Sequence, residues 1–558
     1  MADRIPEIPL TGSRSEEIFP KLTSTQISRI CAHGRSRKVQ RGDVLMEAGQ
    51  QHARFFVVIS GRIDVVRPTD AAELVATFGP GQFTGEINLL SGRRGFVRVL
   101  VAEDGEAVEI DREHLLSLVQ TDGELSEILM RAFILRRSEL IERGVGDVVL
   151  VGSTHSSNTL RIQEFLTRNG HPYKYLDLDQ ETGTQDLLDR FHVSVDDVPV
   201  VICRNRTALK NPTNEEIADC LGFNEVIDET HLRDVVIVGA GPSGLAAAVY
   251  GASEGLDVLV LESVSPGGQA GSSSMIENYL GFPTGISGKK LAAAAHMQAE
   301  KFGAQIAIAR GATRLSCARK PYAVQIDNGP HTPTKTVIIA TGAEYRKLAV
   351  DNLSKFEGAG VYYGATAIEA KLCGGDEVIV VGGGNSAGQA AVYLSQTARR
   401  VHMVVRAAGL SDTMSRYLIR RIEQSSNIVL RTRTEIAALD GSDHLERVSL
   451  RDRQTGNVDV LEIQHVFVMA GAVPNTVWLK GCVVLDASGF IKTGADISPE
   501  ELAAAKWPLT RPPHLLETSL PGVFAVGDVR CGNVKRVASA VGEGAMAVAF
   551  VHRYLAEG

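Results

Sequence analysis

The sequence predicts a multidomain chain in which a small β-roll or barrel comes first and α/β domains follow it. Its 558 residues exceed the roughly 250–300 at which a single hydrophobic core stops growing. Five short apolar runs broken by glycine fill residues 40–110, a spacing typical of antiparallel barrels and rolls. Two later segments each place a glycine-rich turn between a buried strand and a helix. That order is typical of parallel sheets with helices on both faces.

The first glycine-rich turn follows the apolar run 235–238 and has the spacing G-x-G-x-x-G. Its three glycines permit a tight turn, close approach of the backbone to a pyrophosphate, and close packing of the helix on the strand. A second strand, 257–261, ends at an acid that can accept hydrogen bonds from ribose hydroxyls. These features together predict a dinucleotide site made of Gly239, Gly241, Pro242, Ser243, Gly244 and Glu262.

A second fingerprint, G-x-G-x-x-A, follows the strand 377–381. The next strand, 401–405, ends at Arg406 rather than at an acid. A carboxylate there would repel a 2′-phosphate, whereas a guanidinium can bind it, so the pattern favours NADPH over NADH. The sequence therefore predicts two Rossmann-like domains, the second with the candidate residues Gly382, Gly384, Asn385, Ser386, Ala387 and Arg406.

Composition narrows the class of protein. Hydrophobic residues make up 44% and charged residues 22%, as in ordinary soluble globular proteins, and the net charge of −8 argues against nucleic-acid binding. No apolar run is long enough to span a membrane, and the N-terminus lacks a signal-peptide core. Seven scattered cysteines with no Cys-x-x-Cys predict reduced thiols and a cytoplasmic location rather than a disulfide framework. No metal site is assigned.

The N-terminal part, residues 1–145, resembles a cyclic-nucleotide-binding domain. The resemblance rests on a turn at Ser60 and Gly61, on Gly85 followed by Glu86, and on an arginine shortly afterwards. It implies a nucleotide site made of Gly85, Glu86 and Arg93, in which Glu86 accepts from the ribose hydroxyl and Arg93 binds the cyclic phosphate. Gly95 and Phe96 stand where the family carries a small residue and a hydroxyl, so a barrel that serves only as a docking or dimer surface stays an alternative. Residues 122–143 are predicted to form an amphipathic exit helix.

Residues 146–228 predict an α/β domain with strands at 148–151, 173–178 and 197–202, and helices at 158–169 and 214–220. This order resembles a thioredoxin- or glutaredoxin-like domain. The resemblance implies a cis Pro199 and a redox pair at the start of the first helix, where the chain has Ser156 to Thr159 and no sulfur. We therefore expect a redox-inactive spacer or recognition module, with Cys203 and Cys220 as buried thiols.

From Leu232 onward the chain resembles low-molecular-weight thioredoxin reductase, through motifs at 266–269, 276–281, 337–342, 522–528 and 535–544. The resemblance implies a homodimer and an FAD-binding domain in two parts, 229–345 and 476–558, around an NADPH-binding domain, 346–475. The motifs add the candidate FAD contacts Gly268, Gln269, Asn278, Ala340, Thr341, Gly342, Gly527, Asp528, Arg536 and Val537.

The chain departs from that family at the redox-active pair. The family carries Cys-Ala-Thr-Cys, whereas here Gly364 and Ala367 flank the Ala-Thr dipeptide. Glu369 lies where the family has an acid, and Cys373, the nearest thiol, is expected to be structural. Thioredoxin-reductase-like ferredoxin and flavodoxin NADP reductases resemble this chain in lacking the pair.

The sequence thus predicts an NADPH-dependent FAD oxidoreductase that passes electrons to a quinone, an iron–sulfur protein, a flavodoxin or oxygen. A nucleotide at the N-terminal domain is expected to regulate it, and no side chain is needed as an acid or base for hydride transfer. Two alternatives remain: a thioredoxin-disulfide reductase that uses an unrecognised thiol, and a non-catalytic flavin or nucleotide redox sensor.

Overall fold

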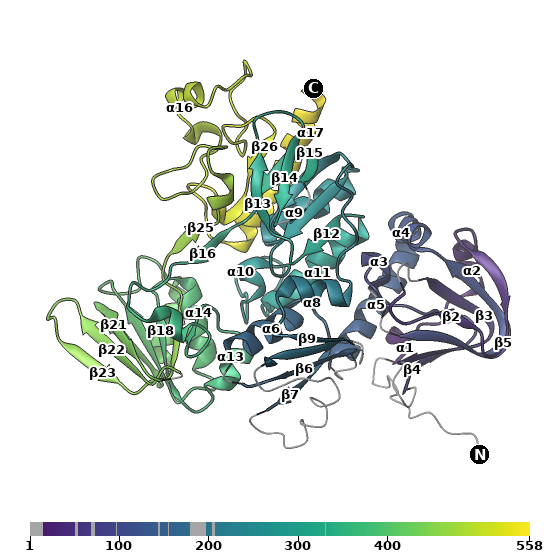
Figure 1. Cartoon of the computed structure of the whole chain (residues 1–558), viewed down its shortest axis with the longest axis horizontal. Helices are drawn as coiled ribbons and strands as arrows, with labels where there is room; N and C mark the ends of the chain where they lie inside the picture. Colours follow the sequence, from purple (N-terminus) through teal and green to yellow (C-terminus); the bar gives the residue numbers. More distant parts are fainter. Residues whose placement is uncertain are drawn as a thin grey trace.

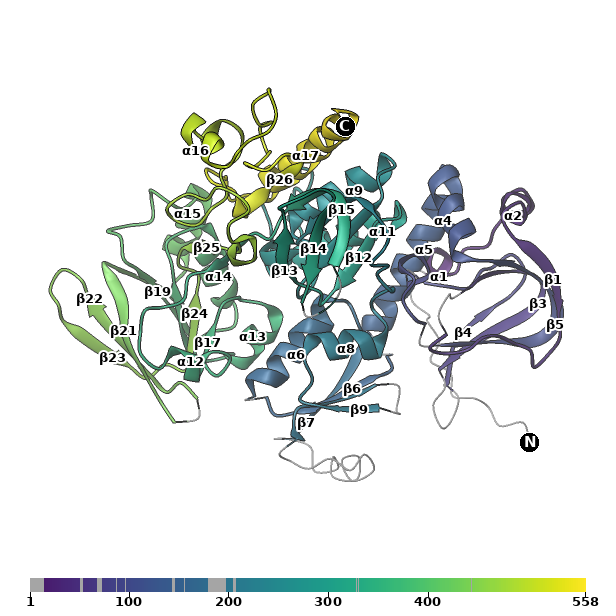
Figure 2. The same ribbon diagram turned by 45° about the horizontal axis from the view of Figure 1, so that its top comes forward.

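The computed structural model arranges the chain as four connected units (Figure 1). The N-terminal barrel lies at one end, the second glycine-motif unit at the other, and the first glycine-motif unit and the middle domain lie between them (Figures 1 and 2). The structure describes residues 15–50, 54–67, 73–86, 88–95, 97–142, 146–154, 156–178, 197–203, 207–327, 329, 331–442 and 444–557.

The barrel is built on a sheet of order β1-β5-β3-β4, with β2 paired to β5. Its helices pack on a core that includes Phe55, Phe83 and Phe133. The predicted exit helix is confirmed as α5. The elements are α1 (Ser15–Ile18), α2 (Ser24–Cys31), β1 (Arg35–Val39), β2 (Val44–Met46), β3 (Phe55–Arg67), β4 (Glu73–Phe78), α3 (Asn88–Ser91), β5 (Arg98–Ile110), α4 (Arg112–Thr121) and α5 (Gly123–Glu142).

The prediction of two strands separated by a turn at Gly61 is wrong, because β3 continues through this glycine. The pairing of β3 with β5 shifts register around Ser60 and Arg62, which marks a bulge. Gly61 has φ +80°, and a Cβ there would lie 2.6 Å from the carbonyl oxygen of Asp104. The glycine therefore permits a bulge in a long strand, which the sequence pattern alone does not distinguish from a turn.

The middle domain has a four-stranded sheet of order β7-β6-β8-β9. Strand β6 is parallel to β7 and antiparallel to β8, and the Val198–Pro199 peptide is cis, as expected. The two predicted helices are confirmed. The elements are β6 (Val148–Gly152), α6 (Ser157–Arg168), β7 (Tyr173–Asp177), β8 (Val200–Cys203), β9 (Thr207–Lys210) and α8 (Asn214–Leu221). Cys203 is buried and Cys220 is partly buried.

The first glycine-motif unit is a sheet of order β12-β11-β10-β15-β14-β13, with β26 paired to β15. Strands β10, β11, β12, β15 and β26 run parallel. The elements are β10 (Arg233–Val238), α9 (Pro242–Ser253), β11 (Val258–Glu262), α10 (Gly268–Gly271), α11 (Gly288–Lys301), β12 (Gln305–Ile308), β13 (Ala312–Ser316), β14 (Tyr322–Ile326), β15 (His331–Ile339), η2 (Val477–Leu479), η3 (Gly494–Asp496), α16 (Pro499–Ala504), β26 (Val523–Ala525), η4 (Gly527–Val529) and α17 (Val537–Glu557).

The second unit is inserted between β15 and β26 and has the parallel order β17-β24-β18-β19-β20. The chain enters it through β16 and leaves through β25, and these two short strands pair antiparallel. The elements are β16 (Ala343–Tyr345), α12 (Leu353–Phe356), β17 (Val361–Tyr362), α13 (Ala367–Leu372), β18 (Glu377–Val381), α14 (Asn385–Leu394), β19 (Arg400–Val405), α15 (Arg416–Gln424), β20 (Ile428–Thr432), β21 (Thr434–Asp440), β22 (Arg447–Asp452), β23 (Val458–Leu461), β24 (His465–Val468) and β25 (Ala472–Pro474).

The prediction that all cysteines are reduced is wrong, because Cys317 and Cys482 form a disulfide. These residues are 165 positions apart and meet because η2 packs beside β13, with Cα atoms 5.9 Å apart. Cysteine spacing cannot reveal a pairing that the tertiary fold creates. The cytoplasmic location therefore loses the support that was drawn from the cysteines. Among the described residues, no helix is long and apolar enough to cross a bilayer.

Candidate functional site

The first glycine turn forms an open cradle at the N-terminus of α9. Gly239 has φ +102°, and a Cβ on Gly244 would lie 1.8 Å from the carbonyl oxygen of Gly239, so the turn and the close helix packing both require glycine. Gly241 is the N-cap of α9 and has no side-chain cap, and a Cβ there would meet no atom within 4 Å. Free backbone N–H groups at a helix N-terminus suit a pyrophosphate. The residues present therefore fit the phosphate part of a dinucleotide.

Glu262 lies at the end of β11, beside this cradle. It is 8% exposed and accepts hydrogen bonds from the backbone N–H groups of Ala240 (2.8 Å), Val264 (2.9 Å) and Ser265 (3.1 Å). Burial raises the pKa of this carboxyl, and the backbone donors oppose that rise. The three N–H groups fix the carboxylate at the edge of the sheet where a ribose would lie.

Several other candidate residues lie where the two units join. Gln269 donates to the carbonyl oxygen of Ala343 on β16 (2.5 Å). The Thr341 hydroxyl donates to the carbonyl oxygen of Asn475 (2.8 Å), and the Asn475 amide donates back to Thr341 (3.0 Å). Asn278 is exposed. Gln269 therefore contacts β16, where the chain enters the second unit, and Thr341 contacts the residue directly after β25, where the chain leaves it.

Glu543, which the sequence analysis does not assign, orders the turn that contains Gly527 and Asp528. It lies on α17 and is 8% exposed. Its carboxylate accepts from the Gly527 N–H (2.7 Å) and from the Arg530 guanidinium (2.7 Å). The signal in the sequence is the acid at the ninth position of the last motif, 535–544. Burial raises the pKa of the neighbouring Asp528, which is half-buried.

The second glycine turn lies at the N-terminus of α14. Gly384 is the N-cap of α14, and the side chain of Asn385 accepts from the Ser415 N–H (2.7 Å). Ser386 hydrogen-bonds to Tyr345, whose pKa is raised by burial and also by the nearby Asp528. Arg406 is exposed directly after β19. The N-terminus of α14 and the Asp528 turn are thus both close to Tyr345.

The segment around Gly364 and Ala367, which holds no cysteine pair, leads into helix α13. Thr366 and Glu369 form a capping box on α13, and burial raises the pKa of Glu369. Cys373 is fully buried, and burial raises the pKa of its thiol to about 11. A thiol with such a pKa is almost wholly protonated at neutral pH and is a weak nucleophile.

The middle domain packs against both glycine-motif units. A Cβ on Gly358 would lie 2.6 Å from Cβ of Ser157, at the start of α6. At the other end of this helix, Arg168 donates to the carbonyl oxygen of Gly268 (2.9 Å) and Asn169 to that of Val264 (3.3 Å). Helix α6 therefore lies between the cradle and the chain leading to α13, as Figure 1 shows.

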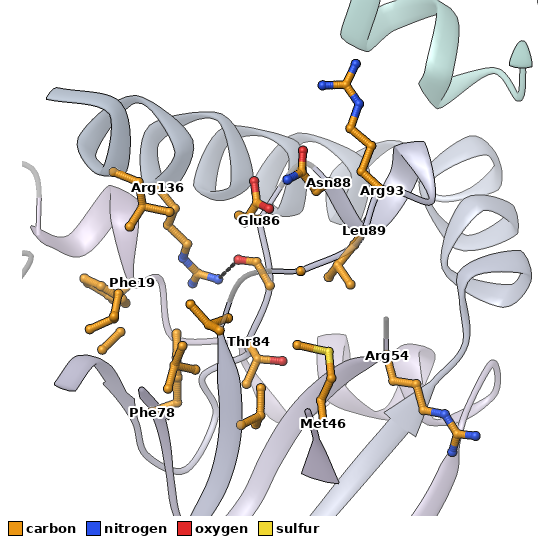
Figure 3. A pocket seen from close by; sticks show the side chains of 18 residues that line it. Phe19, Met46, Arg54, Phe78, Thr84, Glu86, Asn88, Leu89, Arg93 and Arg136 are labelled. Atoms are coloured by element: carbon orange, nitrogen blue, oxygen red, sulfur yellow. Dashed lines mark hydrogen bonds between the residues drawn. The ribbon is translucent and has the colours of Figure 1, made fainter. Parts of the chain in front are cut away.

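The barrel encloses a second candidate site, a cavity with about 710 Å³ of empty space including its open mouth. Glu86 and Arg93, the predicted ribose and phosphate contacts, both line it, but their side chains do not converge on one point (Figure 3). Glu86 lies 3.8 Å from the Arg137 guanidinium, and Arg93 points away from the centre of the cavity. Arg136, which the sequence analysis misses, lines the cavity and donates to the Gly85 carbonyl oxygen (2.8 Å).

Two parts of the chain match known protein families. Residues 233–544 match the family model described as "pyridine nucleotide-disulphide oxidoreductase", and residues 36–122 match the cyclic nucleotide-binding domain. The chain is 34% identical over 324 residues to thioredoxin reductase of Treponema pallidum (strain Nichols), covering 58% of this chain and 97% of that protein.

Two crystal structures are similar to the same part of the chain. Thioredoxin reductase from Lactococcus lactis is 28% identical with a TM-score of 0.52, over 58% of this chain and 100% of the other. Thioredoxin reductase from T. acidophilum is 30% identical with a TM-score of 0.51, over 58% and 98%. The similarity covers both glycine-motif units.

Proposed function

Because the chain belongs to the pyridine nucleotide-disulphide oxidoreductase family and carries a cyclic nucleotide-binding domain, we propose that it is a regulated NADPH-dependent FAD oxidoreductase. We further propose that its electron acceptor is not a protein disulfide but a quinone, an iron–sulfur protein, a flavodoxin or oxygen. The observation that carries the second point is the pair Gly364 and Ala367, together with the burial of Cys373, the nearest thiol.

The geometry of the two turns supports the proposed cofactor assignments. The α9 cradle would hold the FAD pyrophosphate, Glu262 the ribose, and Asp528 the ribityl chain, while the α14 turn would hold NADPH. Bound FAD would supply the hydride-accepting chemistry, so that the chain's own residues only bind and orient. This assignment divides the chain into FAD-binding parts at 229–345 and 476–558 around an NADPH-binding part at 346–475, and the family resemblance favours a homodimer.

The middle domain supports a non-disulfide acceptor in a second way. Its strand order and the position of Ser156 at the N-cap of α6 favour a thioredoxin-like domain without redox sulfur. Ser157 contacts the chain at Gly358, a few residues before Gly364. We propose that this module is a permanent part of the reductase surface that covers the approach to residues 364–367.

The test is an anaerobic titration of the purified chain with NADPH, followed by separate additions of a quinone, a flavodoxin, oxygen and thioredoxin. We expect flavin reduction by NADPH, reoxidation by at least one non-disulfide acceptor, and little or no reduction of thioredoxin. Fast thioredoxin reduction would contradict the proposal. Cys373→Ser and the pair Cys317→Ser and Cys482→Ser would then show which sulfur is responsible. A flavin that NADPH cannot reduce would instead favour a sensor.

Arg406 is expected to select NADPH over NADH. A guanidinium at the end of β19 can make a charge-assisted hydrogen bond to the 2′-phosphate, which is worth about 1.5–3 kcal/mol. Arg406→Ala should therefore reduce the preference for NADPH about tenfold or more, measured as the ratio of flavin-reduction rates in stopped flow. Arg399→Ala, an exposed arginine just before the other end of β19, is the matched control and should change nothing. Equal rates with NADPH and NADH in the parent would refute the role of Arg406.

A further inference from the structure

Arg93 joins the barrel to the neighbouring units, although its position in the sequence predicts a ligand contact. Its Nη2 lies 3.5 Å from Nε2 of His296 on α11, and its guanidinium carbon lies 5.1 Å from the ring centroid of Phe223. The same Nε2 of His296 lies 3.1 Å from the Glu300 carboxylate, so the imidazole stands between the two charged groups. Figure 3 shows the Arg93 side chain extending from the cavity wall toward a neighbouring helix.

The charges at this contact are buried, and they depend on one another. Arg93 is 8% exposed and Glu300 is 7% exposed. Burial by itself would raise the pKa of Glu300, but the contact with His296 and the positive charges of Arg93 and Arg112 hold it below its usual range. A buried carboxylate that loses one of these partners is left poorly compensated, which is costly. A change in the position of Arg93 would therefore alter the electrostatic balance at Glu300.

The barrel side of this interface is otherwise well packed against α11. Gln120 on α4 donates to the carbonyl oxygen of Lys301 (2.9 Å), and Met297 packs against the barrel's hydrophobic core. At the other end of α11, a Cβ on Gly267 would lie 2.4 Å from Cβ of Ala292. Gly267 is the N-cap of α10, which carries Gln269. Helix α11 thus contacts both the barrel and the segment assigned to the flavin.

We propose that Arg93 is shared between two anions: the Glu300 carboxylate of α11, with His296 between them, and the phosphate of a nucleoside cyclic phosphate in the barrel cavity. Because one guanidinium cannot serve both sites, ligand binding withdraws Arg93 from α11. The change at α11 is then passed to α10 and Gln269. The effect on the flavin rests on the proposed function. The competition for Arg93 does not, because it concerns only the binding of the cyclic nucleotide to the barrel.

If the two anions compete for Arg93, substitutions of Glu300 and of Arg93 should change the affinity for ligand in opposite directions. Glu300→Gln keeps the shape of the side chain but removes the competing charge, so more of the chain is ready to bind ligand. We expect its affinity for cyclic AMP or cyclic GMP to rise about tenfold. Arg93→Ala removes the group that binds the phosphate, and we expect its affinity to fall by a hundredfold or more. A contact that is only structural would weaken binding in both variants, or in neither.

The measurement is calorimetry with cyclic AMP and cyclic GMP on the full-length parent, Arg93→Ala, Glu300→Gln and Arg94→Ala. Arg94, the next residue in the same loop, packs beside Gly222 and is the matched control, with unchanged affinity expected. FAD content and the unfolding midpoint identify any variant that misfolds. If Glu300→Gln misfolds, His296→Gln replaces it and is expected to bind the cyclic nucleotide more tightly than the parent does. Unchanged or weaker binding in Glu300→Gln, or no binding by the parent and Glu300→Gln, would overturn the inference. Failure of the proposed function would show separately, as a flavin that NADPH does not reduce.

Discussion

Gly241→Glu is expected to give a folded protein that contains no FAD. A side chain at this position would extend into open space, because a Cβ there meets no atom within 4 Å. The protein itself should therefore tolerate the change, while the added carboxylate would fill the cradle and repel the pyrophosphate. We expect the FAD-to-protein ratio, measured from the visible absorbance, to fall from near one to near zero, with circular dichroism unchanged.

Gly241→Ala is the control for size and charge. It should fold like the parent and keep more FAD than Gly241→Glu, because a methyl group brings no charge to the cradle. Gly244→Ala should behave differently, since its Cβ would lie 1.8 Å from the Gly239 carbonyl oxygen and would disrupt the turn itself. A Gly241→Glu protein that retains stoichiometric FAD would show that the cradle has been assigned to the wrong ligand.

Glu543→Ala is expected to lower stability and FAD retention together. It would leave the Gly527 N–H and the Arg530 guanidinium without the buried carboxylate that accepts from both. Removing one partner of a buried ion pair typically costs about 3–5 kcal/mol. We expect a loss of about 3 kcal/mol in the free energy of unfolding, measured by urea denaturation. We also expect weaker FAD binding, because Asp528 lies in the turn that Glu543 would no longer hold in place.

Glu557→Ala on the same helix is the matched control. Glu557 is also an acid paired with an arginine, at 2.9 Å from Nε of Arg511, but it is exposed. Exposed pairs contribute about 0–1 kcal/mol, so this variant should unfold almost like the parent. Equal losses from the two variants would mean that the burial of Glu543 does not determine its importance.

Much of the fold could be predicted from the sequence, because its signals are local. Strands β10, β11, β18 and β19 are short apolar runs, and the turns after β10 and β18 have glycines at spacings that few other structures require. The predicted helices of the middle domain and the exit helix begin and end close to the predicted residues. In these segments, local pattern and tertiary packing favour the same structure.

The site could be predicted only where a residue's role is set by its own motif. Arg93 lies in the predicted loop, yet its guanidinium contacts His296, which is 203 positions away. Arg136 lines the barrel cavity because α5 folds back over the sheet, and periodicity shows only that α5 is a helix. Glu543 accepts from a turn 16 positions earlier. Such contacts arise from the packing of elements whose order in space the sequence does not state.

The Cys317–Cys482 bond closes a covalent ring that contains the whole inserted sheet, from β17 to β24, together with the entry and exit strands β16 and β25. In the chain-entropy description, closing a ring of this length removes freedom from the unfolded chain worth about 5 kcal/mol. The two halves of the first glycine-motif unit are thereby fastened to each other by sulfur as well as by the pairing of β15 with β26. A backbone cut anywhere inside the insert would leave one molecule rather than two fragments until a reductant opened the ring.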